Sequence, residues 1–320
     1  MTSPGERMLA GAGRVLAIGV GGGGDVAGAL AVAAVCERLG TPWEVGGLTW
    51  ERRPIDPLAG PRRLDEVSGA ERLHECAALA GPATQGPGGF RFAESAAAAA
   101  IGRSTVLIDP GSGSAGAAAG ILAAASRLRC DTVVLLDVGG DVLAHGDEDG
   151  LASPLADAVL LAAAPTIAAG GVGVLGAIFG AGCDGELTPD EVTERLAEVE
   201  RHGPQMGSSV LDAGQVAWLS GTTTAIPTEA SAMAIRCARG ERGQALIRNG
   251  RRNVQLTATG GLLLWFDTNA ALASAARLAH AVGTAPSLQA ADAILAARGV
   301  RTELAYERDA AGEDQAGASA

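Results

Sequence analysis

The chain has 320 residues, a net charge of −12 and a hydrophobic content of 48%, enough to build a substantial core without disulfides or a structural metal. The negative charge argues against nucleic acid and against an anionic membrane surface as partners. Five scattered cysteines without a Cys-x-x-Cys pair are typical of a reducing compartment, so we expect a cytoplasmic protein.

The first elements in chain order predict an α/β fold. Residues 1–13 are rich in Gly, Ser and Pro, and we expect them to be flexible. An apolar strand at 15–20 is followed by a glycine turn, by Asp25 and by a helix at 26–39. A second strand is expected at 43–50. Continuous apolar strands that alternate with helices indicate a parallel sheet covered on both faces.

Residues 51–94 interrupt this pattern. They are rich in Pro, Gly and Arg, and one short helix is expected near 64–79. A loop of this length in a compact domain is usually functional or disordered. We interpret it as a lid over a binding site or as an arm of a homo-oligomer. The alternative is a solvated insertion, because five arginines and five acids between Glu51 and Arg72 balance one another.

The alternation resumes after the insertion. Strands are expected at 105–108, 132–136 and 172–179, each followed by a glycine-containing turn and an acid. Between them we place helices at 115–128 and after Ser153-Pro154, and a further helix after the capping box of Thr188 and Glu191.

Residues 158–182 carry no charge and are long enough to span a bilayer. Pro165 and Gly170-Gly171 interrupt them, and no arginine borders them, so a buried helix and a buried strand are the better interpretation. We therefore expect no membrane association.

The last third is expected to be more helical. We place helices near 211–220, 228–239, 270–282 and 287–298, strands at 254–256, 262–266 and 302–306, and a flexible tail at 309–320. The whole pattern predicts a single domain over 14–308. Its fold class is α/β, with a mainly parallel, doubly wound, Rossmann-like sheet, helices on both faces and a lid-like insertion.

The glycine turn at 19–24 matches G-x-G-x-x-G between a strand and a helix, the pattern of a dinucleotide-binding turn. Asp25 would compete with a pyrophosphate for the amides of that turn, and the acid for the ribose, Glu51, comes 27 residues after Gly24. An NAD(P)-dependent oxidoreductase is therefore one alternative. Asp25 as a simple helix cap is another. In the third, Asp25 faces a ligand, together with the turn residues Gly21, Gly22, Gly23 and Gly24.

Acids follow several of the predicted strands, namely Asp25, Asp109, Asp137, Asp141 and Asp184. Loops after parallel strands meet at one edge of the sheet, and hard divalent cations take oxygen ligands. We expect Mg²⁺ or Mn²⁺ on Asp137, Asp141 and Asp184, and catalytic roles for Asp137, Asp141 and His145. A single acid in such a position is more often a cap or a turn residue. The turn from Asp137 to Asp141 favours function, because two acids bracket two glycines that let the backbone come close.

Basic side chains could supply the other half of the site. Residues 236–252 contain six arginines and one acid, Glu241, and arginine binds phosphate or carboxylate with two parallel hydrogen bonds. A surface patch is the alternative. The further ligand-binding candidates are Glu51, Arg52, Arg62, Gly139, Gly140 and Glu229.

Several stretches together resemble family 1152 of the domains of unknown function, which is found in archaea and actinobacteria. They are IGVGGGGDVAGAL, LTWERRPIDPLAGPRRLDE, LLDVGGDVLAHGDEDGLASPLADA, GAGCDGELT and IRCARGERG. The resemblance covers about 14–308. It implies one conserved α/β architecture and brings no activity with it. It places Glu51, Arg52 and Arg62 within matching stretches.

The leading hypothesis is an enzyme that acts on a small anionic metabolite, such as a nucleotide, a sugar phosphate or an amino-acid derivative. Divalent-metal-assisted hydrolysis, lyase or transfer chemistry would occur at the carboxyl edge of the sheet. The alternatives are a non-catalytic metabolite sensor and the NAD(P)-dependent oxidoreductase.

Overall fold

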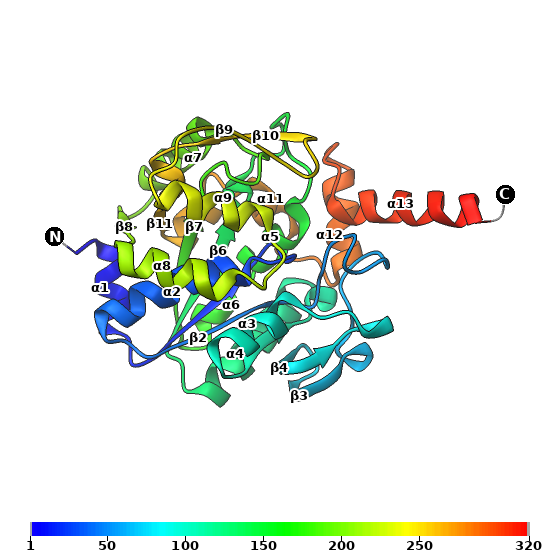
Figure 1. Cartoon of the computed structure of the whole chain (residues 1–320), viewed down its shortest axis with the longest axis horizontal. Helices are drawn as coiled ribbons and strands as arrows, with labels where there is room; N and C mark the ends of the chain where they lie inside the picture. The colour runs from blue at the N-terminus through cyan, green and yellow to red at the C-terminus, as the bar shows by residue number, and fades with distance from the viewer. Residues whose placement is uncertain (1, 319–320) are drawn as a thin grey trace.

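The computed structural model describes residues 2–318, with the backbone alone from residue 313 onward. This part of the chain forms a nine-stranded mixed sheet with helices on both faces (Figure 1). Five central strands run parallel, in the order β5 (Thr105–Ile108), β2 (Trp43–Leu48), β1 (Val15–Gly19), β6 (Thr132–Val138) and β7 (Gly173–Phe179). The predicted α/β fold class is confirmed.

The chain winds outward from β1 in both directions. It passes first through β2 to β5 and then returns to the other side of β1 with β6 and β7. The direction of winding changes between β1 and β6, and in such sheets ligands bind outside the carboxyl ends of the strands at this switch point. The register pairs Gly19 with Leu136, so the turn after β1 and the residue Asp137 lie at the same level.

Antiparallel strands extend both edges of the sheet. Beyond β5 lie β4 (Ala77–Gln85) and β3 (Ser68–His74), and beyond β7 lie β11 (Leu262–Phe266) and β8 (Ser208–Val210). The helix expected near 64–79 is therefore wrong, and much of the predicted lid is part of the sheet. The apolar residues of 64–79 are compatible with a strand or with a helix. They form strands because β4 pairs with β5, a tertiary contact that the local pattern does not contain.

The core has two layers, because alternate residues of each strand face opposite sides. Leu16 and Ile18 of β1 face one layer, and Val15 and Ala17 face the other. Helices of the first layer are α4 (Gly113–Leu128), α5 (Pro154–Leu161), α6 (Ala164–Ala169), α7 (Pro189–Glu200), α10 (Thr268–Leu272), α11 (Arg277–Val282) and α12 (Leu288–Ala296). Helices of the second are α1 (Pro4–Gly11), α2 (Val26–Leu39), α3 (Ala93–Ile101), α8 (Ala213–Thr223) and α9 (Glu229–Ala238).

A small second sheet consists of β9 (Gly243–Ile247) and β10 (Arg252–Leu256). Its apolar side chains pack into the second layer, and its turn and the start of β10 carry three arginines, Arg248, Arg251 and Arg252. This hairpin brings part of the arginine-rich stretch close to the carboxyl edge of the sheet.

Both ends differ from the prediction. Residues expected to be flexible form α1, which the capping box of Ser3 and Glu6 begins. The strand expected at 302–306 and the tail to residue 318 form one helix, α13 (Glu303–Ala318), which leaves the body of the molecule (Figure 1). Residues 319 and 320 lie outside the described residues. The helix expected at 270–282 is divided into α10 and α11.

The uncharged stretch 158–182 forms a helix and a strand as predicted, but it is buried only in part. The end of α5 and most of β7 are buried, whereas α6 buries only Ala164 and Ile167. None of the helices in the described chain has the length and apolar character needed to cross a membrane.

Candidate functional site

Six acidic side chains gather at the switch point between β1 and β6. One oxygen from each of Asp25, Asp137 and Asp157 lies within 4.8 Å of the other two, and we call these residues the first triad. Asp141, Asp184 and Glu186 meet the same criterion and form the second triad. The two triads together are the acid cluster. The structure thus brings together Asp25, Asp137, Asp141 and Asp184, as predicted.

The glycine turn shapes the first triad. Gly22, Gly23 and Gly24 all have positive φ angles, which residues other than glycine rarely adopt. The turn folds back so that the Gly21 amide donates to Oδ2 of Asp25 at 2.9 Å. Asp25 makes no capping hydrogen bond to α2 in the described chain, so the helix-cap interpretation is wrong. The Gly21 amide is also occupied, and a pyrophosphate would have to displace Asp25 from it.

Asp137 ends the central strand β6 and is held by the turn that follows. Its Oδ2 accepts hydrogen bonds from the amides of Gly140 at 2.7 Å and Val142 at 3.3 Å. Gly139 has a φ of 138°, and a Cβ at this position would collide with the carboxyl group of Asp184. Gly139 therefore allows the turn to approach the second triad closely, while Gly140 leaves room for Val192 of α7.

Two carboxylates of the cluster lack partners. Oδ1 of Asp157 is buried without a hydrogen bond, and Asp157 lies in the first turn of α5. Asp141 is 6% exposed, its carboxylate oxygens keep some contact with solvent, and no hydrogen bond or ion pair reaches its side chain from any described residue. Buried polar groups without partners are rare in folded proteins, and each indicates a missing ligand or a role in chemistry.

Burial is the main influence on the acidity of the cluster. It raises the pKa of Asp25 to about 7 and that of Asp184 to about 8. Burial, and then repulsion between neighbouring carboxylates, raises the pKa values of Asp137, Asp141 and Asp157 well above the usual range. The cluster at neutral pH therefore needs protons or cations to compensate its negative charge.

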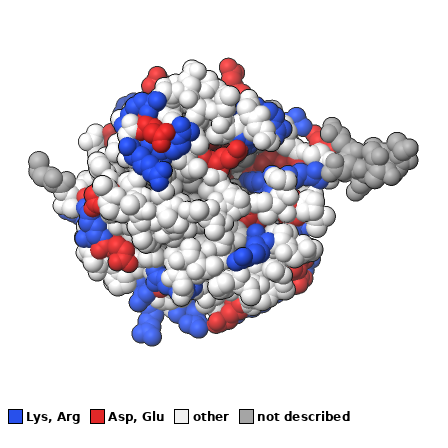
Figure 2. Space-filling model, viewed as in Figure 1, with Lys and Arg blue, Asp and Glu red and all other residues white. Residues whose placement is uncertain are grey.

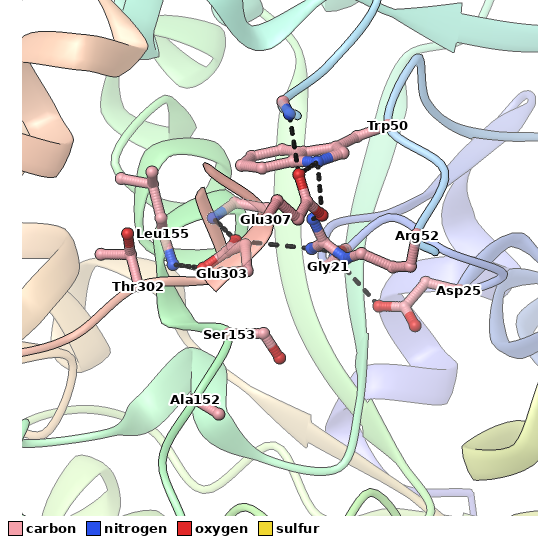
Figure 3. Close-up of polar contacts among 12 residues, drawn as sticks. Gly21, Asp25, Trp50, Arg52, Ala152, Ser153, Leu155, Thr302, Glu303 and Glu307 are labelled. Atoms are coloured by element: carbon pink, nitrogen blue, oxygen red, sulfur yellow. Dashed lines mark hydrogen bonds and ion pairs between the residues drawn. The ribbon is translucent and has the colours of Figure 1, made fainter. Parts of the chain in front are cut away.

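Arg52 lies beside the first triad. Its guanidinium donates to the Gly21 carbonyl at 2.6 Å and contacts Glu303 and Glu307 of α13, both at 3.4 Å (Figure 3). The charges of Glu303 and Glu307, and then those of Asp157 and Asp25, raise the pKa of the Arg52 guanidinium. Arg52, one of the predicted ligand-binding candidates, thus lies beside the acid cluster.

Glu186 anchors the chain that leads into α5. Its Oε2 accepts the amides of Ala152 and Ser153, both at 2.7 Å, and its Oε1 accepts the Ser153 hydroxyl. Arg248 and Arg252 lie 3.7 Å from Oε1. Two arginines of the predicted basic stretch therefore reach the second triad.

The remaining residues of the insertion have local partners. Glu51 accepts the amide of Ala93 at the start of α3, and Arg62 forms an ion pair with Asp56 at 2.9 Å. Arg62 also donates to the Gly60 carbonyl. Glu51 and Arg62 thus stabilise the framework of the loop, and none of these bonds is directed at the acid cluster.

His145 and Glu229 also have partners outside the cluster. Nε2 of His145 lies 3.0 Å from Glu198 of α7, and Glu229 accepts the amide of Arg248 at 2.8 Å. Asp109, at the end of the outer strand β5, accepts the Gly111 amide in its own turn. The turn-residue interpretation therefore holds for Asp109.

Sequence reasoning missed four residues of the site, namely Asp157, Glu186, Glu303 and Glu307. Asp157 is the single charge in the apolar helix PLADAVLL, and Glu186 follows Asp184 by two residues. Both were detectable as isolated acids in buried surroundings. The two glutamates of α13 carry no such signal, because they belong to a polar segment.

The space-filling view shows acidic side chains at the bottom of a hollow near the base of α13, with basic side chains beside it (Figure 2). A different hollow, of about 600 Å³, lies near the start of β2 and is lined by residues that include Trp43, Arg103 and Trp218. It contains no member of the acid cluster, so we assign the chemistry to the switch point.

The comparisons with known proteins identify a family and add no activity. Residues 16–311, nearly the whole chain, match the family model described as "Protein of unknown function (DUF1152)". No curated protein and no solved structure matches the chain. The chain therefore belongs to the DUF1152 family.

Proposed function

We propose that the protein is an enzyme that acts on a small anionic metabolite by chemistry that a divalent cation, Mg²⁺ or Mn²⁺, assists. The reaction class is hydrolysis, lyase or transfer chemistry. The observation that carries the proposal is the first triad, whose three carboxylates converge within 4.8 Å at the switch point. Oδ1 of Asp157 is buried there without a partner.

The charge balance of the triad supports a cation. Three carboxylates at this separation repel one another strongly in a buried setting. The nearest positive side chain, Arg52, is shared with the Gly21 carbonyl and with two glutamates of α13. Hard divalent cations prefer carboxylate oxygens and often keep water ligands that can be activated.

The surroundings supply groups for an anionic substrate. Arg52 lies on one side of the cluster, and Arg248 and Arg252 lie on the other, against Glu186. Arginine recognises phosphate and carboxylate groups through parallel hydrogen bonds. In this proposal Asp25, Asp137 and Asp157 bind the cation, and the arginines bind the anionic group of the metabolite.

Titration of the metal-free protein with Mn²⁺ in a calorimeter tests the cation. We expect saturable binding, and at least tenfold weaker binding to Asp137→Asn, a loss of about 1.4 kcal/mol or more. The melting temperature of the variant should stay close to that of the wild type. Asp109→Asn is the matched control, since Asp109 is a buried acid after a parallel strand but outside the cluster. Absence of Mn²⁺ binding to the wild type would contradict the proposal.

Turnover is tested with a panel of phosphate esters and carboxylated metabolites in the presence of Mn²⁺. We expect Mn²⁺-dependent turnover by the wild type and by Asp109→Asn, and none by Asp137→Asn. Binding of a panel compound with Mn²⁺ but without turnover would favour the sensor in place of the enzyme.

A further inference from the structure

We propose that the second triad binds a second divalent cation through Asp141 and Asp184, so that the acid cluster is a two-cation centre. This inference rests on the proposed function, which assigns one cation to the first triad. It adds a separate site with its own ligands.

The state of the Asp141 carboxylate points to a ligand. Only 6% of the surface of Asp141 is exposed. One of its carboxylate oxygens lies within 4.8 Å of a carboxylate oxygen of Asp184 and of one of Glu186. No described residue donates a hydrogen bond or forms an ion pair with it. A charged group in this position is costly unless it is paired, and its neighbours are acids.

The other two members of the triad divide into a ligand and an anchor. Asp184 accepts one hydrogen bond, from the Glu186 amide to Oδ1 at 3.2 Å. Glu186 is bonded through both oxygens to Ala152 and Ser153. We therefore assign the cation to Asp141 and Asp184, and we assign Glu186 the role of a positioning residue.

The two triads are close enough to act as one centre. Oδ2 of Asp137, in the first triad, accepts hydrogen bonds from the amides of Gly140 and Val142. These two residues flank Asp141 of the second triad, so both triads are built on the same turn after β6.

One Mg²⁺ or Mn²⁺ commonly uses one or two carboxylates and completes its shell with water or substrate oxygens. Five aspartates at one switch point exceed the needs of a single ion. Paired divalent cations bind an anionic oxygen group between them, and they stabilise both the attacking and the leaving oxygen. Arginines on both sides of the cluster fit a substrate with such a group, for example a phosphate.

The stoichiometry of Mn²⁺ measured by native mass spectrometry and calorimetry tests the inference. We expect two Mn²⁺ per wild-type chain and per Asp109→Asn chain. Asp141→Asn and Asp157→Asn should each retain one. The electron paramagnetic resonance spectrum of the loaded wild type should show exchange coupling between two Mn²⁺ ions, and either variant should lose it. Asp184→Asn replaces Asp141→Asn if the latter fails to fold.

The outcomes separate the two proposals. One Mn²⁺ in the wild type that Asp157→Asn removes and Asp141→Asn does not affect would overturn the second site and leave the proposed function intact. No Mn²⁺ bound to the folded wild type would overturn both.

Discussion

Gly21 controls the space between two carboxylates of the first triad. A Cβ on this residue would lie 2.7 Å from Oδ2 of Asp25 and 3.1 Å from Oδ2 of Asp157. Its φ is not in the left-handed region, so a substitution here tests space and not backbone strain. The obstacles are the ends of side chains, which can rotate away at low cost.

We predict that Gly21→Ala weakens Mn²⁺ binding about tenfold or more while the chain remains folded, because the new methyl group displaces Asp25 from the cation position. Calorimetry and the melting temperature provide the two measurements. Gly221→Ala in α8 is the control. A Cβ at Gly221 would meet no atom within 4 Å outside its own helix turn. We therefore expect unchanged Mn²⁺ binding, and a free energy of unfolding raised by about 0.5–1 kcal/mol because alanine favours the helix over glycine. Unchanged binding in Gly21→Ala would show that the cation lies elsewhere.

Helix α13 is attached to the site through two glutamates one helical turn apart. Glu303 accepts the amides of Leu155 and Ala156 at 3.0 and 2.9 Å, at the start of α5, and contacts Arg52 (Figure 3). Glu307 accepts the indole N–H of Trp50 and the amide of Gly60. An acid at a helix N-terminus is stabilised by the exposed amides and the helix dipole. Glu303 of α13 therefore docks by accepting hydrogen bonds from the free amides at the start of α5.

We predict that Glu303→Ala lowers the free energy of unfolding by roughly 2 kcal/mol, because two buried amides lose a charged acceptor. Urea denaturation measures it. Asp65→Asn is the control, since the Asp65–Arg63 ion pair is exposed and such pairs contribute well below about 1 kcal/mol. An equal, small effect in both variants would show that α13 does not depend on this contact.

The acid cluster determines how the stability of the whole molecule depends on pH. Acids whose folded pKa is raised hold protons that the unfolded chain has released. The folded chain therefore loses stability as pH rises from the unfolded pKa near 4 to the folded pKa values of about 7 for Asp25 and about 8 for Asp184. Burial raises the pKa of Glu51 to about 7 as well, so Glu51 adds to the same slope from outside the cluster.

We predict that the metal-free protein is more stable at pH 5 than at pH 8, with a slope of about 1.4 kcal/mol per pH unit for each excess proton. Urea denaturation at a series of pH values measures the slope. Saturating Mn²⁺ should reduce it, because a bound cation replaces the protons of the cluster. Asp157→Asn without metal should also reduce it. A slope of opposite sign would contradict the raised pKa values.

The sequence alone determined the parallel core of the sheet and the edge at which the acids meet. Apolar runs such as 15–20 and 132–136 have the length of buried strands, and each is followed by a glycine turn and an acid. Strand direction then places Asp25, Asp137 and Asp184 at one edge without knowledge of distances. The start of α7 could also be predicted from local sequence, because Thr188 and Glu191 form a capping box in which each side chain accepts the backbone amide of the other residue.

Tertiary structure decided the features that depend on distant partners. The β3–β4 hairpin forms because β5 offers an open edge, and α13 docks where Arg52 and the amides at the start of α5 donate to its glutamates. Asp157 and Asp141 became recognisable as unpartnered only when the chain around them was folded. Local patterns specify which faces are apolar, but the absence of a hydrogen-bond partner is a property of the complete three-dimensional neighbourhood.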